Sequence, residues 1–331
     1  MRLRVVLMST VLMMFLCSAW SLNTLFYVRG SPNNKVISRY IAHADKISTI
    51  APQTYSVDEK GQVTGVVPKA LINLANKNHI AIMPLVVNHW FSSQEMTHRF
   101  LANATAQRKA IATLVKLAKE NHFQGIQVDF ENMYNSDRNL FTKFYQRMSD
   151  AFHKNDLQIS VAVLALTDCS LTKSVYDISA LEKVSDFITI MTYDQHWRNS
   201  KPGPVASVDY IQKNIEIALK YIPSEKISFG VPTYGYHWDS KSSRAKYTNW
   251  ALATQFLERH DEELQWDQKA QVPYAKIWYR GVQHTIFVEN TQSFLAKISL
   301  AKKYNLRGIS VWSLNDAPVG IWDHLPNAHV S

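Results

Sequence analysis

The sequence predicts an α/β fold, a (β/α)8 TIM barrel that carries a small α+β insertion between its seventh and eighth strands. Short runs rich in β-branched residues alternate with amphipathic helical stretches along the chain, and such alternation forms parallel βαβ units. Eight such runs are present, which is the number of strands in this barrel. Polar and aromatic residues directly follow several of them, at the strand end where barrel enzymes place catalytic residues.

The individual elements follow from hydrophobic periodicity, with Pro, Ser or Asp at several helix starts. The expected strands are Thr24 to Arg29, Ile47 to Val57, Ile80 to Val87, Gly125 to Glu131, Gln158 to Leu166, Phe187 to Tyr193, Lys226 to Tyr234 and Gly308 to Leu314. The expected helices include Pro68 to Lys77, Ala106 to His122, Leu140 to Lys154, Val208 to Tyr221 and Gln292 to Tyr304. An open, doubly wound sheet is the alternative. It would carry a glycine-rich phosphate loop after the first strand, where Gly30 stands alone.

The alternation breaks between the seventh and eighth strands, where about seventy residues, from 235 to 307, are too many for one crossover helix. The segment WALATQFLERH is typical of a helix, whereas LQWDQKAQVPYAKIWYR and TIFVEN are typical of strands, joined through Gly281. We therefore expect a small inserted module at about residues 240–290. Such a module can form one wall of a cleft or be a passive decoration.

The first 21 residues have the pattern of a secretory signal peptide. Arg2 and Arg4 precede an apolar stretch from Val5 to Leu16, and the small residues Ser18 and Ala19 follow. The stretch is shorter than the roughly 20 apolar residues that a bilayer span requires, although an uncleaved membrane anchor remains the alternative. We expect residues 22–331 to form the mature barrel, secreted or located in the periplasm or cell envelope, without stable membrane insertion.

The formal charge of the chain is +9 at pH 7, and its lysines and arginines are scattered. A nucleic-acid-binding protein would usually carry a basic cluster or a recognisable motif, so we expect no nucleic-acid partner. Scattered positive charge gives weak attraction to polyanions such as an anionic cell-wall polymer, or it has no specific partner at all. We expect a monomer.

The run FQGIQVDFENM places Asp129 and Glu131 two positions apart at the end of a buried strand. Side chains at positions i and i+2 of a strand point to the same face. Two carboxyl groups that share a small volume separate their pKa values, so that one can stay protonated near neutral pH. The pair therefore indicates acid/base chemistry, the alternative being carboxylates that only cap the following helix or face solvent.

Four segments carry a resemblance to a known family. GIQVDFENM, ITIMTYDQHW, ISFGVPTYGYHW and GISVWSLND follow one another at the ends of strands four, six, seven and eight. Together they resemble glycoside hydrolase family 18, the chitinase family, over nearly the whole mature chain. The run GPVASVDYIQKNIEIALKYIPSEKISFGVPTYGY is most similar to the subgroup of spore cortex-lytic N-acetylglucosaminidases.

The resemblance implies hydrolysis of β-1,4 bonds in peptidoglycan or chitin-type polymers by a retaining mechanism in which the substrate's N-acetyl group is the nucleophile. No cofactor is implied. Glu131 would be the acid and base, Asp129 would orient the acetamido group, and Tyr193 would hold its oxygen. The implied substrate contacts are Asp194, Met191, Trp312, Tyr234, Trp90, Trp197 and Gln127.

Some of these residues have simpler explanations. Met191 and Trp312 can fill a core, and we expect at most two of Trp90, Trp197, Tyr234 and Trp238 to contact sugars. His89, His196 and His237 lack the spacing of a metal site, so we expect no metal.

The chain departs from the family pattern at Gln124 and Gln127, where aspartates are usual. We expect Gln127 to donate a hydrogen bond to Asp129 and to keep Asp129 more readily ionised than a second carboxylate would, which would alter the pH profile. If these glutamines disable the site, the protein would be a catalytically silent sugar-binding protein. A scaffolding role on a borrowed fold is the third alternative.

Overall fold

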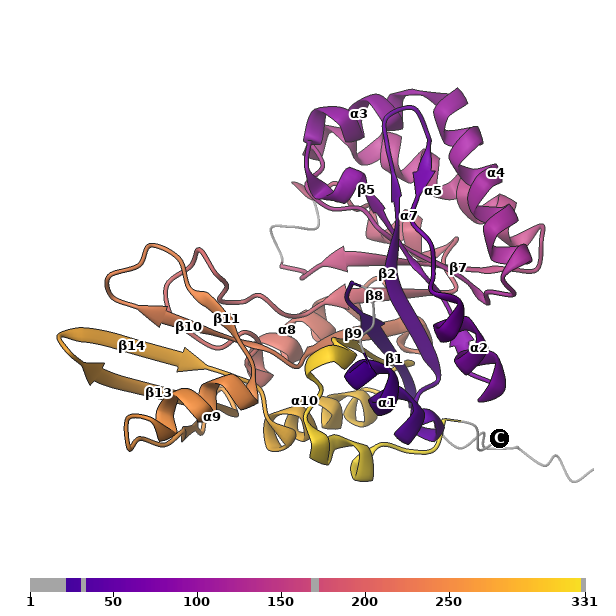
Figure 1. Cartoon of the computed structure of the whole chain (residues 1–331). Coiled ribbons are helices and arrows are strands. Elements are labelled where there is room, and N and C mark those ends of the chain that lie inside the picture. Colours follow the sequence, from indigo (N-terminus) through magenta and orange to yellow (C-terminus); the bar gives the residue numbers. More distant parts are fainter. Residues whose placement is uncertain (1–21, 31–33, 168–172, 329–331) are drawn as a thin grey trace, which may run out of the picture.

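The computed structural model describes residues 22–30, 34–167 and 173–328, so the expected signal peptide lies outside the described residues. Eight parallel strands form a closed barrel, because β1 pairs with both its sequence neighbour and the last strand. The predicted TIM barrel is thereby confirmed (Figure 1). In spatial order the barrel strands are β1 (Asn23–Val28), β15 (Gly308–Trp312), β9 (Ile227–Pro232), β8 (Phe187–Met191), β7 (Gln158–Leu164), β6 (Gly125–Asp129), β5 (Leu85–Asn88) and β2 (Thr49–Val57).

Several strands end earlier than the sequence predicts, because the polar residues after them belong to the loops above the barrel. The expected third strand is split into β4 (Ala81–Ile82) and β5, with Pro84 between them. Proline has no N–H to donate to a neighbouring strand, which interrupts the ladder at this position. A two-residue strand, β3 (Val63–Thr64), adds to β2 beyond the barrel.

Helices surround the barrel and bury their apolar faces against its outer surface. The predicted helices are present with shifted ends, and the described residues contain three further ones that were not predicted: α1, α3 and α7. Asn103 separates α3 from α4, since its side chain accepts hydrogen bonds from the first main-chain N–H groups of α4. The helices are α1 (Asn34–Ala42), α2 (Lys69–Lys77), α3 (Gln94–Ala102), α4 (Ala104–Glu120), α5 (Arg138–His153), α7 (Ile178–Glu182), α8 (Val208–Ala218) and α10 (Thr291–Lys303).

The interior of the barrel contains a polar network rather than a purely apolar core. Tyr27 donates to Oε1 of Gln127 at 2.5 Å, and Nε2 of Gln127 donates to Ser160 and Thr189 at 3.0 Å each. The hydroxyl of Thr189 lies 3.0 Å from that of Ser310. Since each buried polar group has a partner, the network fixes these strands relative to one another instead of destabilising them.

The chain segment that connects β9 to β15 forms a second, antiparallel sheet. This sheet projects to one side of the barrel (Figure 1). One face of this insertion is covered by α9, through Ala253 and Leu257. Gly281 connects two of its strands with φ of +69°, a backbone conformation that favours glycine. The elements are β10 (Gly235–Asp239), β11 (Lys246–Thr248), α9 (Trp250–Glu258), β12 (Gln265–Asp267), β13 (Val272–Tyr279) and β14 (Val282–Phe287).

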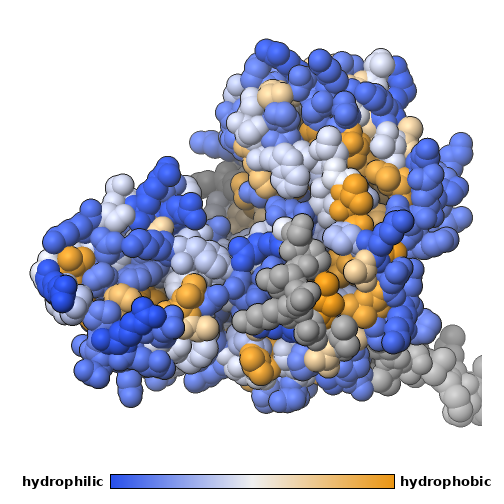
Figure 2. All heavy atoms as spheres, viewed as in Figure 1, coloured by the Kyte–Doolittle hydropathy of each residue, from blue (hydrophilic) through white to orange (hydrophobic). Residues whose placement is uncertain are grey.

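Hydrophilic residues cover most of the face seen in Figure 2, over both the barrel and the insertion. Within residues 22–30, 34–167 and 173–328, none of the helices combines the length and apolar character needed to cross a membrane.

Candidate active site

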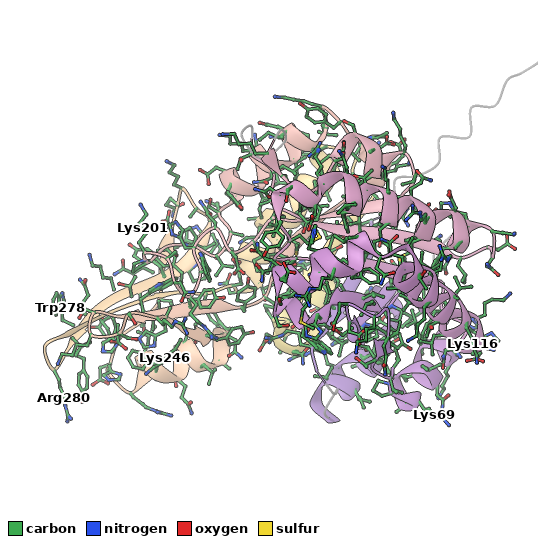
Figure 3. The ribbon with its side chains drawn as sticks, turned by 90° about the horizontal axis from the view of Figure 1, so that it is seen from above. Lys69, Lys116, Lys201, Lys246, Trp278 and Arg280 are labelled. Carbon is green, nitrogen blue, oxygen red and sulfur yellow. The ribbon has the colours of Figure 1, made fainter. Side chains whose placement is uncertain are left out.

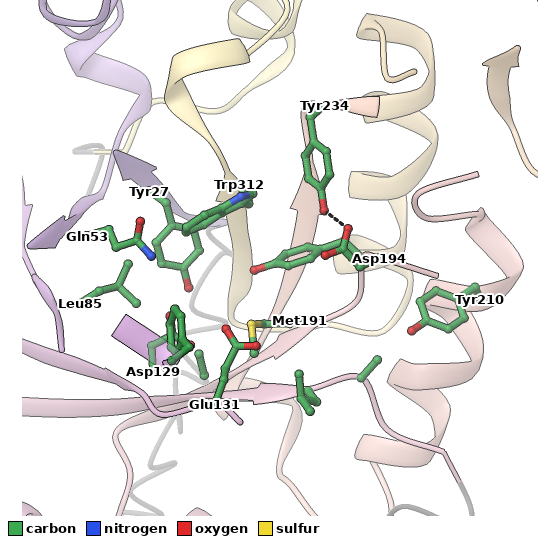
Figure 4. A pocket seen from close by; sticks show the side chains of 15 residues that line it. Tyr27, Gln53, Leu85, Asp129, Glu131, Met191, Asp194, Tyr210, Tyr234 and Trp312 are labelled. Carbon is green, nitrogen blue, oxygen red and sulfur yellow. Dashed lines mark hydrogen bonds between the residues drawn. The ribbon is translucent and has the colours of Figure 1, made fainter. Parts of the chain in front are cut away.

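A pocket of about 340 Å³ opens above the carboxyl ends of the barrel strands (Figure 4). Seven residues named from the sequence line it, namely Asp129, Glu131, Met191, Tyr193, Asp194, Tyr234 and Trp312. They come from four different strand ends, which the closed barrel brings together. The sequence did not indicate the other lining residues, which are Tyr27, Gln53, Leu85, Phe91, Ala162, Leu164, Ala165 and Tyr210.

Asp129 is the last residue of β6, and Glu131 follows it on the same side, so both carboxyl groups reach the pocket. Asn88, at the end of β5, holds the main chain of Glu131 from both directions. Its Oδ1 accepts from the Glu131 N–H at 2.9 Å, and its Nδ2 donates to the Glu131 carbonyl at 2.6 Å. Tyr176 donates to the carbonyl of Phe130 at 2.6 Å. These bonds fix the backbone that carries the two carboxyl groups.

Burial makes ionisation of both carboxyl groups unfavourable. It raises the pKa of Glu131 to about 7, with a further contribution from the charge of Asp194. Burial also raises the pKa of Asp129 well above its usual range, and the neighbouring Glu131 adds to this effect. The pair therefore retains a proton at neutral pH. Oδ1 of Asp129 is buried and has no hydrogen-bond partner among the described residues, so an acceptor inside the pocket is left for a ligand's donor.

Gln127 does not act as the sequence predicts. Its side chain is fully buried below the pocket, and its Nε2 donates to Ser160 and Thr189 rather than to Asp129. The predicted hydrogen bond is therefore wrong, and burial, together with the neighbouring Glu131, is what raises the pKa of Asp129. Gln124 is farther away still, since it precedes β6 and lines a hollow at the opposite end of the barrel.

Asp194 lies beyond the end of β8 at the mouth of the pocket, where its φ of +54° is one that aspartate tolerates. Tyr234 donates to its Oδ1 at 2.5 Å. Burial raises the pKa of Asp194, and the hydrogen bond from Tyr234 partly offsets the rise. Tyr193 packs against β9, where a Cβ at Gly230 would lie 2.5 Å from its ring. Glycine at that position therefore leaves the space that the Tyr193 ring occupies.

The insertion fixes the side chain of Tyr234 through a stacking contact. The ring of Tyr247, in β11, stacks on that of Tyr234 with centroids 5.6 Å apart and planes 9° apart. The Tyr247 hydroxyl donates to Asp316 at 2.6 Å and accepts from Arg29 at 2.7 Å, and Arg29 also pairs with Asp316. No sequence pattern indicated this cluster, because its members come from the first strand, the insertion and the C-terminal region.

Trp312 forms one wall of the pocket, with its ring centroid 5.2 Å from that of Tyr27. Trp90 and Trp197 do not line the pocket; their exposed fractions are 53% and 45%. Trp238 is buried, and its Nε1 donates to the carbonyl of Ser200 at 3.0 Å. Among the described residues, no group of three or more His, Cys, Asp or Glu side chains is arranged to hold a metal ion.

Comparison with known proteins agrees with this geometry. Residues 27–317 match glycosyl hydrolases family 18. The uncharacterized glycosylase YvbX of Bacillus subtilis is 27% identical over 285 residues, which are 83% of each chain. The cortical fragment-lytic enzyme of the same organism is 28% identical over 254 residues, covering 74% of this chain and 59% of that protein. The crystal structure of a chitinase from Chromobacterium violaceum has a TM-score of 0.83 and 28% identity, covering 94% of this chain and all of the other.

The match includes seven barrel strands in full and the end of β1, together with the strand ends that line the pocket and the insertion between β9 and β15. The chain belongs to glycosyl hydrolase family 18 and is a glycosidase related to cortex-lytic enzymes and chitinases.

Proposed function

We propose that the protein is an exported, retaining glycosidase that cleaves β-1,4 bonds beside N-acetylglucosamine in peptidoglycan or chitin-type polymers. One observation carries the proposal: Glu131 lines the pocket with its pKa raised to about 7. A carboxyl group with that pKa can donate a proton to a leaving group and later accept one from water at neutral pH. The relatives named as a chitinase and a cortical fragment-lytic enzyme support a substrate made of amino sugars.

In the first step, the carbonyl oxygen of the substrate's N-acetyl group attacks the anomeric carbon while the bond to the glycosidic oxygen breaks. Glu131 transfers its proton to that oxygen, so the leaving sugar departs as a neutral alcohol. A cyclic oxazolinium ion remains. In the second step, water attacks the anomeric carbon from the face that the leaving group vacated. Glu131 accepts a proton from the water, and the configuration is retained.

The neighbouring residues hold the acetamido group in place for this attack. Oδ1 of Asp129, which has no partner in the described part of the chain, accepts the acetamido N–H. Burial raises the pKa of Tyr193, so its hydroxyl stays protonated and donates to the acetamido oxygen. Trp312 supplies an apolar surface beneath the reacting sugar, and Asp194 binds a sugar hydroxyl at the mouth of the pocket.

Turnover of a chromogenic N-acetylglucosamine oligomer tests the proposal. Glu131→Gln keeps the shape of the side chain but removes the proton donor, so we expect a loss of at least about 10²-fold in kcat with oligomer binding retained. Glu120→Gln is the matched control, because its side chain is 57% exposed on α4. Binding without turnover by the wild-type chain would contradict the proposal and indicate a silent sugar-binding protein.

Parallel digestion of purified peptidoglycan and chitin, with mass analysis of the released ends, then identifies the polymer and distinguishes internal from terminal cleavage. The mass of the protein recovered from the cell envelope or the medium tests export, since removal of residues 1–21 is expected.

A further inference from the structure

We propose that the insertion carries a second glycan-binding surface, formed by Lys276, Trp278, Gln283 and Thr285 and called here the Trp278 face. This inference deepens the proposed function and rests on it. The ligand of the Trp278 face would be a glycan chain of the same polymer, bound several sugars away from the bond that is cleaved. The side chains that make up this surface lie on neighbouring strands, β13 and β14.

The strand register places these four side chains on one side of the sheet. Trp278 is directly opposite Gln283, and Lys276 is directly opposite Thr285. Residues opposite each other in an antiparallel pair project to the same face, as do residues two apart in one strand. The other face carries Ile277 and Ile286, which pack on α9. The Trp278 face therefore points away from that helix.

Trp278 is the most exposed tryptophan of the described chain, at 69%. Its neighbour Tyr279 packs edge-on against His260, with centroids 4.3 Å apart, and has Arg280 over its ring. Trp278 has no such contact, and within the described residues its indole N–H has no hydrogen-bond partner. Figure 3 shows Trp278 and Arg280 at the end of the insertion farthest from the barrel. The ring of Trp278 is therefore free to stack on a ligand at this hairpin.

The groups around this ring suit a sugar. The flat indole can stack on the C–H face of a pyranose, while the amide of Gln283 and the hydroxyl of Thr285 can donate to and accept from sugar hydroxyls. Gln283 and Thr285 also line a hollow of about 210 Å³, together with Trp238 and Ser240. The surface thus combines an apolar plane with two neutral hydrogen-bonding groups and the Lys276 ammonium group, which can donate to sugar oxygens, beside a recess.

The Trp278 face is connected to the pocket by a row of aromatic residues. Tyr234 lines the pocket, Tyr236 contacts it with ring centroids 5.7 Å apart, and Trp238 follows at 5.8 Å from Tyr236. Trp238 is directly opposite Thr285 in the neighbouring strand. The antiparallel sheet of the insertion therefore joins the two sites, so a glycan chain bound at the Trp278 face would stay close to Glu131.

The test compares Trp278→Ala with Trp250→Ala on polymeric and short substrates. Trp250 is a fair control, since it is also exposed, at 38%, and lies in α9 of the same insertion. We expect Trp278→Ala to weaken binding to insoluble chitin or peptidoglycan roughly threefold to tenfold, with a similar loss of hydrolysis of that polymer. Hydrolysis of a short soluble chromogenic oligomer should change by less than about twofold, and Trp278→Phe should restore part of the polymer binding.

The inference is overturned if Trp278→Ala leaves polymer binding unchanged, if Trp250→Ala causes the same loss, or if the soluble oligomer is affected equally. It is also overturned if Trp278→Ala reduces binding to anionic phospholipid vesicles and not to the polymer, which would indicate a membrane surface as the partner. Failure of the proposed function is a distinct result, because the wild-type chain would then not turn over the soluble oligomer at all.

Discussion

Glu131 acts as an acid only if its carboxyl is protonated and its main chain is fixed. Burial meets the first condition by raising its pKa to about 7. Asn88 meets the second through two hydrogen bonds to the Glu131 main chain. Asn88 could be placed at a strand end from the sequence, but its contact with a residue 43 positions later depends on the closed barrel.

The pH dependence of kcat/KM follows from this residue. The acid form of Glu131 is present below its pKa, so activity should fall as the pH rises through about 7. An acid with the ordinary pKa of glutamate would already lose activity above about pH 4.3. A pH profile on the chromogenic oligomer checks this, and a decline centred near the ordinary value would contradict it.

Tyr234→Phe tests the hydrogen bond to Asp194. The bond from Tyr234 lowers the pKa of Asp194, so its removal should raise that pKa and leave Asp194 less often ionised. A neutral Asp194 no longer raises the pKa of Glu131. The alkaline limb of the profile should therefore move to lower pH, with a loss of about tenfold in kcat/KM. Tyr221→Phe, at an exposed tyrosine, is the control; an unmoved limb in Tyr234→Phe would refute the coupling.

At the scale of elements, a buried ion pair connects the insertion to the barrel. Glu289 follows β14, and Lys297 lies in α10, which packs on the barrel. The two residues are 1% and 0% exposed, with Nζ 2.6 Å from Oε2, and Ser293 donates to the same oxygen at 2.6 Å. Neither residue was singled out from the sequence, because charged residues are usually at the surface.

Lys297→Met should destabilise the fold by about 3 to 5 kcal/mol, because it leaves the Glu289 carboxylate buried with Ser293 as its remaining donor. The double variant Glu289→Leu, Lys297→Met should recover much of this loss, since no buried charge remains. Urea unfolding measures both. Lys302→Met, at an exposed lysine of the same helix, should change stability by less than about 0.5 kcal/mol. Equal unfolding midpoints for Lys297→Met and Lys302→Met would show that the pair contributes nothing.

The elements also show what the sequence could predict. Alternating periodicities were sufficient for the eight strands and the barrel, because each strand is a short buried run and each helix has one apolar face. Loop conformations were not predictable in this way. Trp90 and Trp197 follow strand ends as expected, yet both are exposed and neither lines the pocket. Gln127 accepts a hydrogen bond from Tyr27 in β1 and donates to Ser160 in β7 and Thr189 in β8, and the approach of these strands depends on the fold as a whole.

At the scale of the whole molecule, the acid role that we propose for Glu131 competes with stability. Its pKa is higher in the folded chain than in the unfolded chain, so the folded state binds more protons in the interval between them. The stability that this proton provides is complete below the unfolded pKa and is lost as the pH rises through about 7. A buried acid that is useful for catalysis therefore makes the protein less stable at alkaline pH.

Glu131→Gln should remove this dependence of folding stability on pH. Its stability relative to the wild-type chain should rise between pH 5 and pH 8, by at most about 3 kcal/mol, because glutamine does not ionise. Thermal melts of both proteins at the two pH values measure the effect, with Glu120→Gln as the exposed control. A constant difference in melting temperature between the wild-type chain and Glu131→Gln would contradict it.

The most direct test of the central claim is an NMR titration of the Glu131 side-chain carboxyl carbon, assigned by its absence from Glu131→Gln. We expect a midpoint near pH 7, as burial and the charge of Asp194 require. A midpoint near 4.3, the ordinary value for glutamate, would show that this carboxyl holds no proton at neutral pH and cannot be the acid.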